Sequence, residues 1–89
     1  MNLHADVRSI PNPQSKVLAH ASVTFALGAD GQLVIDGFSV IEKDGAFWIA
    51  PPARKGESRY FPVVTLAGKV RADVERAILA EFERQRKVA

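Results

Sequence analysis

The chain of 89 residues contains no cysteine. Disulfide bonds, thiolate nucleophiles and cysteine-ligated zinc sites are therefore excluded. Glycine and proline are scarce, with 6 and 5 residues, which excludes collagen-like and low-complexity chains. No apolar run approaches the ~18 residues of a membrane-spanning helix, and the first residues lack the basic and apolar regions of a signal peptide. These absences favour a single cytoplasmic domain that spans residues 1–89.

Catalytic patterns are also missing. No metalloprotease, nucleophile-elbow or phosphate-loop motif occurs in the sequence. The two histidines, His4 and His20, each fall in a predicted strand, where we expect a surface role. Asp30, Asp36 and Asp44 lie in turn-rich positions, where aspartate supports backbone geometry. We expect a protein that is not an enzyme and that uses no cofactor and no metal.

Alternating apolar residues predict short strands through residues 1–64. In the clearest of them the odd positions from Val17 to Leu27 form one apolar face. Gly28–Gly31 and Asp44–Gly45 predict hairpin turns. Pro51–Pro52 ends a strand, and the polar stretch from Ala53 to Arg59 predicts a loop. Strands are expected near residues 3–8, 17–27, 33–40, 46–50 and 60–64.

The apolar phase changes within the third of these strands. Leu33 and Ile35 are odd, whereas Phe38 and Val40 are even. A one-residue shift exchanges the two faces of a strand, so a β-bulge near Asp36–Gly37 is the simplest explanation. Two alternatives follow: the bulge returns all four side chains to one core face, or both faces are apolar and a second copy covers the far one.

A helix is predicted from Leu66 to Arg86, within a C-terminal region of residues 65–87, with Thr65 as its N-cap. One face carries a stripe of apolar residues at helical spacing, which should pack on the sheet: Leu66, Val70, Val74, Ala77, Ile78 and Phe82. Leu79 lies about 140° from the centre of the stripe. It is either an isolated exposed leucine or a contact with a second subunit. The fold class is therefore α+β, a twisted antiparallel sheet of about five strands crossed by one C-terminal helix.

Positive charge is concentrated in the second half of the chain. Residues 1–50 carry three Lys or Arg and five acids, whereas residues 51–89 carry nine and five. Arg54, Lys55 and Arg59 lie beside two aromatic residues, a combination that neutralises phosphates and can stack on bases. The alternative is a solvated loop whose charges only aid solubility. On the helix, interspersed acids favour local ion pairs on a plain surface.

In this order the residues resemble the SpoVG (stage V sporulation, septation protein) family. The segments that carry the resemblance are Asp6–Arg8, Ala19–Phe25, Val40–Glu42, Phe47–Lys55 and Phe61–Val63. Pro51 stands where members usually have methionine, and the loop after Lys55 is shorter than in the family. The family consists of small bacterial nucleic-acid-binding regulators that form dimers through their sheets. The resemblance therefore implies DNA or RNA binding in gene regulation, with the basic loop and the helix as the contact region.

The expected function is sequence-selective DNA or RNA binding by a homodimer, without a membrane or small-molecule partner. The expected phosphate contacts are Arg54, Lys55, Arg59, Lys69 and Arg71. The alternative is a protein-interaction module that uses an exposed sheet edge. Trp48 is expected in the core of the sheet or of a dimer.

Overall fold

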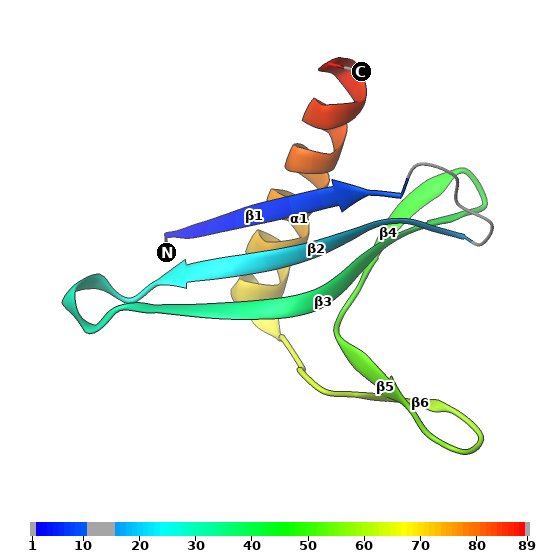
Figure 1. Cartoon of the computed structure of the whole chain (residues 1–89), viewed down its shortest axis with the longest axis horizontal. Helices are drawn as coiled ribbons and strands as arrows, with labels where there is room; N and C mark the ends of the chain where they lie inside the picture. Colours follow the sequence, from blue (N-terminus) through cyan, green and yellow to red (C-terminus); the bar gives the residue numbers. More distant parts are fainter. Residues whose placement is uncertain (1, 11–15, 89) are drawn as a thin grey trace.

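One antiparallel sheet is crossed on one face by a C-terminal helix (Figure 1). The computed structural model describes residues 2–10 and 16–88. The sheet has the order β1-β2-β3-β4, and its strands are β1 (Leu3–Ser9), β2 (Val17–Ala26), β3 (Gln32–Lys43) and β4 (Ala46–Ala50). The remaining elements are the 3-10 turn η1 (Gly28–Asp30), the strands β5 (Ala53–Lys55) and β6 (Tyr60–Pro62), and the helix α1 (Gly68–Val88). The predicted α+β class is confirmed, with four strands in the main sheet and two in a separate hairpin.

Strand β2 forms the centre of the apolar face. Ala19, Ala21, Val23 and Phe25 are buried, as the alternation predicts. Leu27 does not belong to this face, because it lies beyond the end of β2 and is half-exposed. The register between β2 and β3 also shifts between Val17 and Ala19, and Leu18 packs against the core. Strict alternation placed Leu18 on the opposite face, so that expectation is wrong at this irregularity.

The predicted bulge at Asp36–Gly37 is confirmed. Ala21 pairs with Phe38 and Val23 pairs with Ile35, so β3 contributes one residue more than β2 over this interval. Gly37 has a φ of +98°, a backbone conformation that favours glycine. The bulge places Phe38 on the same face of the sheet as Ile35, where Phe38 is one of the most deeply buried side chains. The two apolar phases of β3 therefore serve one core.

The two predicted hairpin turns are also confirmed. Gly28–Asp30 form η1 between β2 and β3, with Gly31 as its C-cap, and Asp44–Gly45 join β3 to β4 with φ values of +54° and +80°. Positive φ at both central residues is the signature of a type I′ turn, which matches the twist of paired strands.

The helix begins later than the sequence predicts. Its first residue is Gly68, with a φ of +66°, so Thr65 lies three residues upstream and is not the N-cap. The predicted apolar stripe is correct from Val70 onward, since Val74, Ile78 and Phe82 are buried against the sheet. Leu66 precedes the helix, and it packs against the core from that segment. Leu79 is partly buried within the chain.

Two contacts fix the C-terminal half of α1 on the sheet. Phe82 meets Phe47 of β4 edge to face, with ring centroids 5.3 Å apart, and the Arg86 guanidinium lies 4.9 Å from the Phe47 ring centroid. At the opposite edge of the sheet, Gln85 Nε2 donates a hydrogen bond to the Val7 carbonyl of β1, at 2.8 Å. The helix therefore spans the sheet from one edge strand to the other.

Candidate nucleic-acid interface

The β5–β6 hairpin projects away from the body formed by the sheet and α1 (Figure 1). Its strands pair Arg54 with Phe61 and Lys55 with Tyr60. The Gly56 amide donates to the Arg59 carbonyl at 2.7 Å, which closes the tip. The sequence predicted a loop over residues 53–59, and this is wrong for Ala53–Lys55, which form strand β5.

Two contacts at Pro52 hold the root of the hairpin. Pro52 is buried, and its carbonyl accepts a hydrogen bond from the Val63 amide at 2.8 Å. Its ring lies against the bulge, because a Cβ built on Gly37 would come within 3.2 Å of Pro52 Cβ. The bulge and the hairpin are thus coupled at a backbone position where the positive φ and the close approach of Pro52 both favour glycine.

The hairpin carries three of the five predicted site residues. Arg54 and Arg59 are exposed. Lys55 follows Arg54 in β5, and its backbone pairs with that of Tyr60 in β6. Arg54 makes no ion pair with any residue that the structure describes. Glu57 is the acidic residue of the same hairpin, so residues 53–62 carry three positive charges and one negative. This arrangement can present positive charge to a phosphate backbone.

The other two predicted residues, Lys69 and Arg71, lie in the first turns of α1 and are already paired. Lys69 Nζ is 2.7 Å from Asp73 Oδ2, and Arg71 Nε is 3.1 Å from Glu75 Oε2. Arg76 makes a second contact with Asp73, at 3.2 Å. The hydrogen bond from Lys69 is the main cause that lowers the pKa of Asp73 below its usual value. The interpretation of the helix surface as a set of local ion pairs is confirmed at these positions.

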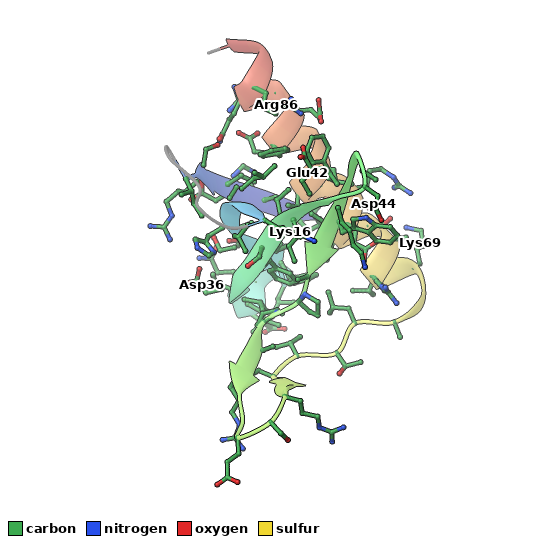
Figure 2. The ribbon with its side chains drawn as sticks, turned by 90° about the vertical axis from the view of Figure 1, so that its right-hand side faces the viewer. Lys16, Asp36, Glu42, Asp44, Lys69 and Arg86 are labelled. Carbon is green, nitrogen blue, oxygen red and sulfur yellow. The ribbon has the colours of Figure 1, made fainter. Side chains whose placement is uncertain are left out.

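The structure therefore divides the five predicted residues into two groups. In Figure 2 the hairpin extends from the bottom of the molecule, whereas Lys69 lies higher, beside the start of α1. Arg71 lies between the two regions, because it lines a pocket together with Pro51, which precedes the hairpin.

Trp48, which the sequence predicts in the core of the sheet or of a dimer, lies on the face of the sheet away from α1. Trp48 pairs with Ile41 across β3 and β4, and it lies opposite to the face where Val40 is buried. Its side chain is 60% exposed, so it is not a core residue of the sheet. The two histidines are exposed on strands, as expected.

Among the described residues, no group of three or more His, Cys, Asp or Glu is arranged to hold a metal ion. Nor does the described chain contain a helix with the length and apolar character needed to cross a membrane. Comparison of the chain with protein-family models, with curated proteins and with solved structures gives no match.

Proposed function

We propose that this protein binds nucleic acid, DNA or RNA, in the control of gene expression, and that the β5–β6 hairpin is its main contact surface. The proposal includes a cytoplasmic location and a role without catalysis or cofactor. The observation that carries it is an exposed two-stranded ribbon, outside the main sheet, with basic residues at Arg54, Lys55 and Arg59. A two-stranded ribbon fits the major groove of a duplex, and its cations release counterions when they meet phosphates.

The resemblance to the SpoVG family supports the same function from a different direction. The segment Phe47–Lys55, which carries much of that resemblance, contains strand β4, the buried Pro52 and strand β5. This one segment therefore leads into the hairpin and forms its first strand, whereas Asp6–Arg8, Ala19–Phe25 and Val40–Glu42 lie in the main sheet.

The direct test removes the two adjacent cations of β5. We expect Arg54→Ala combined with Lys55→Ala to weaken binding to random DNA and RNA pools. The slope of log K against log salt should become shallower by up to about two, at roughly 0.7 to 0.9 per lost phosphate contact. Gel mobility shifts at two or more salt concentrations measure both quantities. Circular dichroism checks that the double variant folds. Arg54 is exposed, and exposed substitutions seldom cost more than about 0.5 kcal/mol.

A matched control removes the same amount of charge elsewhere. Lys16 and Lys43 are exposed on the body, in the half of the chain with more acids than bases. Replacing both with alanine should leave the salt slope unchanged. Equal losses in the two double variants would show that only net charge matters, and an unchanged slope in the hairpin variant would overturn the proposal.

We also propose that the protein is a homodimer through its sheet. The change of phase in β3 does not support this, because the bulge gathers both phases on one face. The support comes from Trp48, Ile41 and Val34, which lie on the face away from α1, with Trp48 60% and Val34 49% exposed. Sedimentation equilibrium should give about twice the chain mass of 9.7 kDa. A mass of one chain would reject the dimer.

The second candidate is a protein-interaction module, and the edge of the sheet favours it. Strand β4 pairs with β3 on one side, and no described strand pairs with its other side. A partner strand could add there through backbone hydrogen bonds. Added salt separates the candidates, since phosphate binding should weaken steeply whereas strand addition should respond little.

A further inference from the structure

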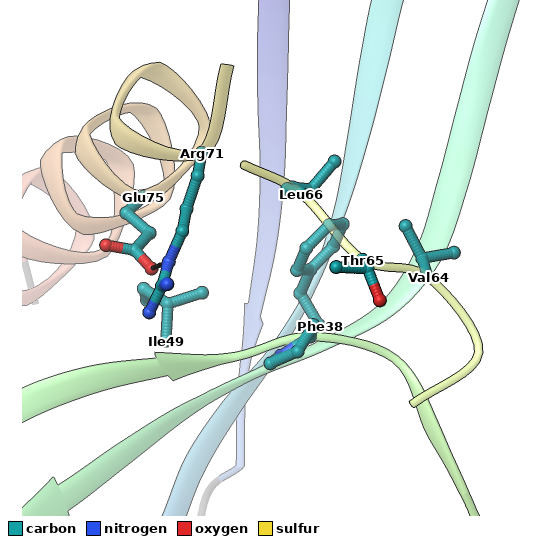
Figure 3. A pocket seen from close by; sticks show the side chains of 8 residues that line it. Phe38, Ile49, Val64, Thr65, Leu66, Arg71 and Glu75 are labelled. Atoms are coloured by element: carbon teal, nitrogen blue, oxygen red, sulfur yellow. Dashed lines mark hydrogen bonds and ion pairs between the residues drawn. The ribbon is translucent and has the colours of Figure 1, made fainter. Parts of the chain in front are cut away.

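A pocket of about 250 Å³ lies between the start of α1, the segment that leads into it, the middle of β3 and the end of β4 (Figure 3). Its floor is apolar and consists of Phe38, Ile49 and Pro51. Val64, Thr65 and Leu66 form the wall opposite the helix, where the Thr65 hydroxyl is a polar group, and Arg71 and Glu75 line the helix side. The pocket is thus apolar on most sides and carries one pair of opposite charges.

The size of the pocket limits its occupant. An apolar cavity of about 150 Å³ accommodates a benzene ring. The additional volume here leaves space for a few more non-hydrogen atoms beyond such a ring. Pockets for drug-sized ligands begin at roughly 300 Å³, so the occupant has to be smaller than those. An apolar group the size of a leucine or phenylalanine side chain, with a short polar end, fits these limits.

The charged side of the pocket determines the polar end. One contact joins the two residues, from Arg71 Nε to Glu75 Oε2, at 3.1 Å. The two terminal nitrogens of Arg71 and the second carboxylate oxygen of Glu75 make no hydrogen bond with the described residues. Arg71 can still donate to a carboxylate, and Glu75 can still accept from an ammonium group.

We propose that this pocket binds a free α-amino acid with an apolar side chain. The carboxylate would meet Arg71, the ammonium group would meet Glu75, and the side chain would pack against Ile49 and Pro51. A simple carboxylic acid would satisfy Arg71 but would be repelled by Glu75, and a simple amine would face the reverse problem. A zwitterion matches both charges at once. The proposal goes beyond nucleic-acid binding, and its test contains no nucleic acid, so either can fail without the other.

The experiment is a titration of the labelled protein followed by backbone amide shifts in NMR spectra. The probes are L-phenylalanine, 3-phenylpropionate without the ammonium group, and phenethylamine without the carboxylate. Phenylalanine should shift the amides of Ile49, Leu66, Arg71 and Glu75 with a Kd on the order of 1 mM, typical of a small ligand at an open site. The two singly charged probes should bind at least about fivefold more weakly, since each leaves one charge unmatched.

Two variants and two controls test the assignment of the charged groups. Arg71→Gln and Glu75→Gln should each weaken phenylalanine binding several-fold. Arg71→Gln should also lose the preference for phenylalanine over phenethylamine, and Glu75→Gln the preference for phenylalanine over 3-phenylpropionate. Arg76→Gln and Glu83→Gln, exposed or partly exposed positions of the same helix outside the pocket, should bind as the unmodified chain does. Circular dichroism checks that all four fold. Equal affinity for the three probes, or no pocket shifts at saturating phenylalanine, would overturn the proposal.

Discussion

The helix and the β5–β6 hairpin carry the same excess of positive charge but hold it differently. Residues 68–88 contain six basic and four acidic residues, and residues 53–62 contain three and one, so each region has a net charge of +2. On the helix every acidic residue forms an ion pair with a basic residue three or four positions away. On the hairpin, Arg54 makes no such pair with a described residue.

This difference teaches that charge counts alone do not locate a binding surface. A phosphate that approaches Lys69 or Arg71 competes with a carboxylate already in contact, whereas one that approaches Arg54 meets no such competitor in the described structure. Exposed ion pairs add little to stability, but their carboxylate repels a second anion such as a phosphate. A zwitterion is not repelled in this way, because its ammonium group matches the carboxylate. Under the proposed function, we therefore expect the hairpin to make the phosphate contacts and the helix to belong to the framework formed with the sheet.

The largest expected effect tests the framework. Phe38 is 1% exposed at the bulge, so Phe38→Ala should lower the free energy of unfolding by about 3–5 kcal/mol. Urea denaturation measures the loss. Leu33→Ala is the control on the same strand and face, and it should cost less than half as much because Leu33 is half-exposed. Similar losses at both positions would mean that the bulge does not organise the core.

The next effect tests the connection between framework and hairpin. Gly37→Ala combines a φ of +98° with a Cβ only 3.2 Å from Pro52 Cβ, so it should destabilise the fold by about 1–3 kcal/mol. Gly45→Ala shares the positive φ but meets no atom within 4 Å, so it isolates the backbone cost. If the two variants unfold at the same urea concentration, the contact with Pro52 contributes nothing.

Much of the framework could be predicted from the sequence, because local patterns encode it. The change of phase between Ile35 and Phe38 located the bulge, and helical spacing identified the apolar stripe of α1. The start of α1 could not be predicted, since a glycine with positive φ, Gly68, defines it and Thr65 offered a better capping side chain.

The candidate site was predicted only in part. Strand β5 has three residues and no apolar alternation, so only its pairing with β6 reveals it. The ion pairs of Lys69 and Arg71 follow from i, i+4 spacing, and that signal was present in the sequence. The pocket has no sequence signal, because it arises where residues 64–66 pack beside strands that are distant in the chain.

A double variant on the helix sharpens the comparison. Lys69→Gln combined with Arg71→Gln removes as much charge as the double variant on β5. We expect the salt slope of nucleic-acid binding to fall by less than about one, because both cations are engaged by carboxylates. The same mobility-shift series measures it. A slope change as large as that of the hairpin variant would place the helix in the interface and contradict the division.

The smallest effect concerns the link between α1 and the edge strand β1. Glu81 accepts hydrogen bonds from Arg84 Nε and Gln85 Nε2, both at 3.0 Å, and Gln85 also donates to the Val7 carbonyl. The contact with Arg84, followed by that with Gln85, lowers the pKa of Glu81 from 4.5 to about 2. The folded state therefore binds fewer protons than the unfolded state between these two values. The stabilisation is complete above pH 4.5 and is lost as the pH falls towards 2.

Replacing Glu81 with Gln should remove this contribution to acid sensitivity. The thermal midpoint of the variant should fall less steeply than that of the unmodified chain between pH 4.5 and about 2. Glu83→Gln is the control, since its ion pair with Arg86 is longer, at 3.5 Å, and takes no part in the contact with β1. It should keep the original pH dependence. Parallel curves for Glu81→Gln and the unmodified chain would show that the Arg84–Glu81–Gln85 contacts do not stabilise the folded helix, and the framework would then depend on its apolar stripe alone.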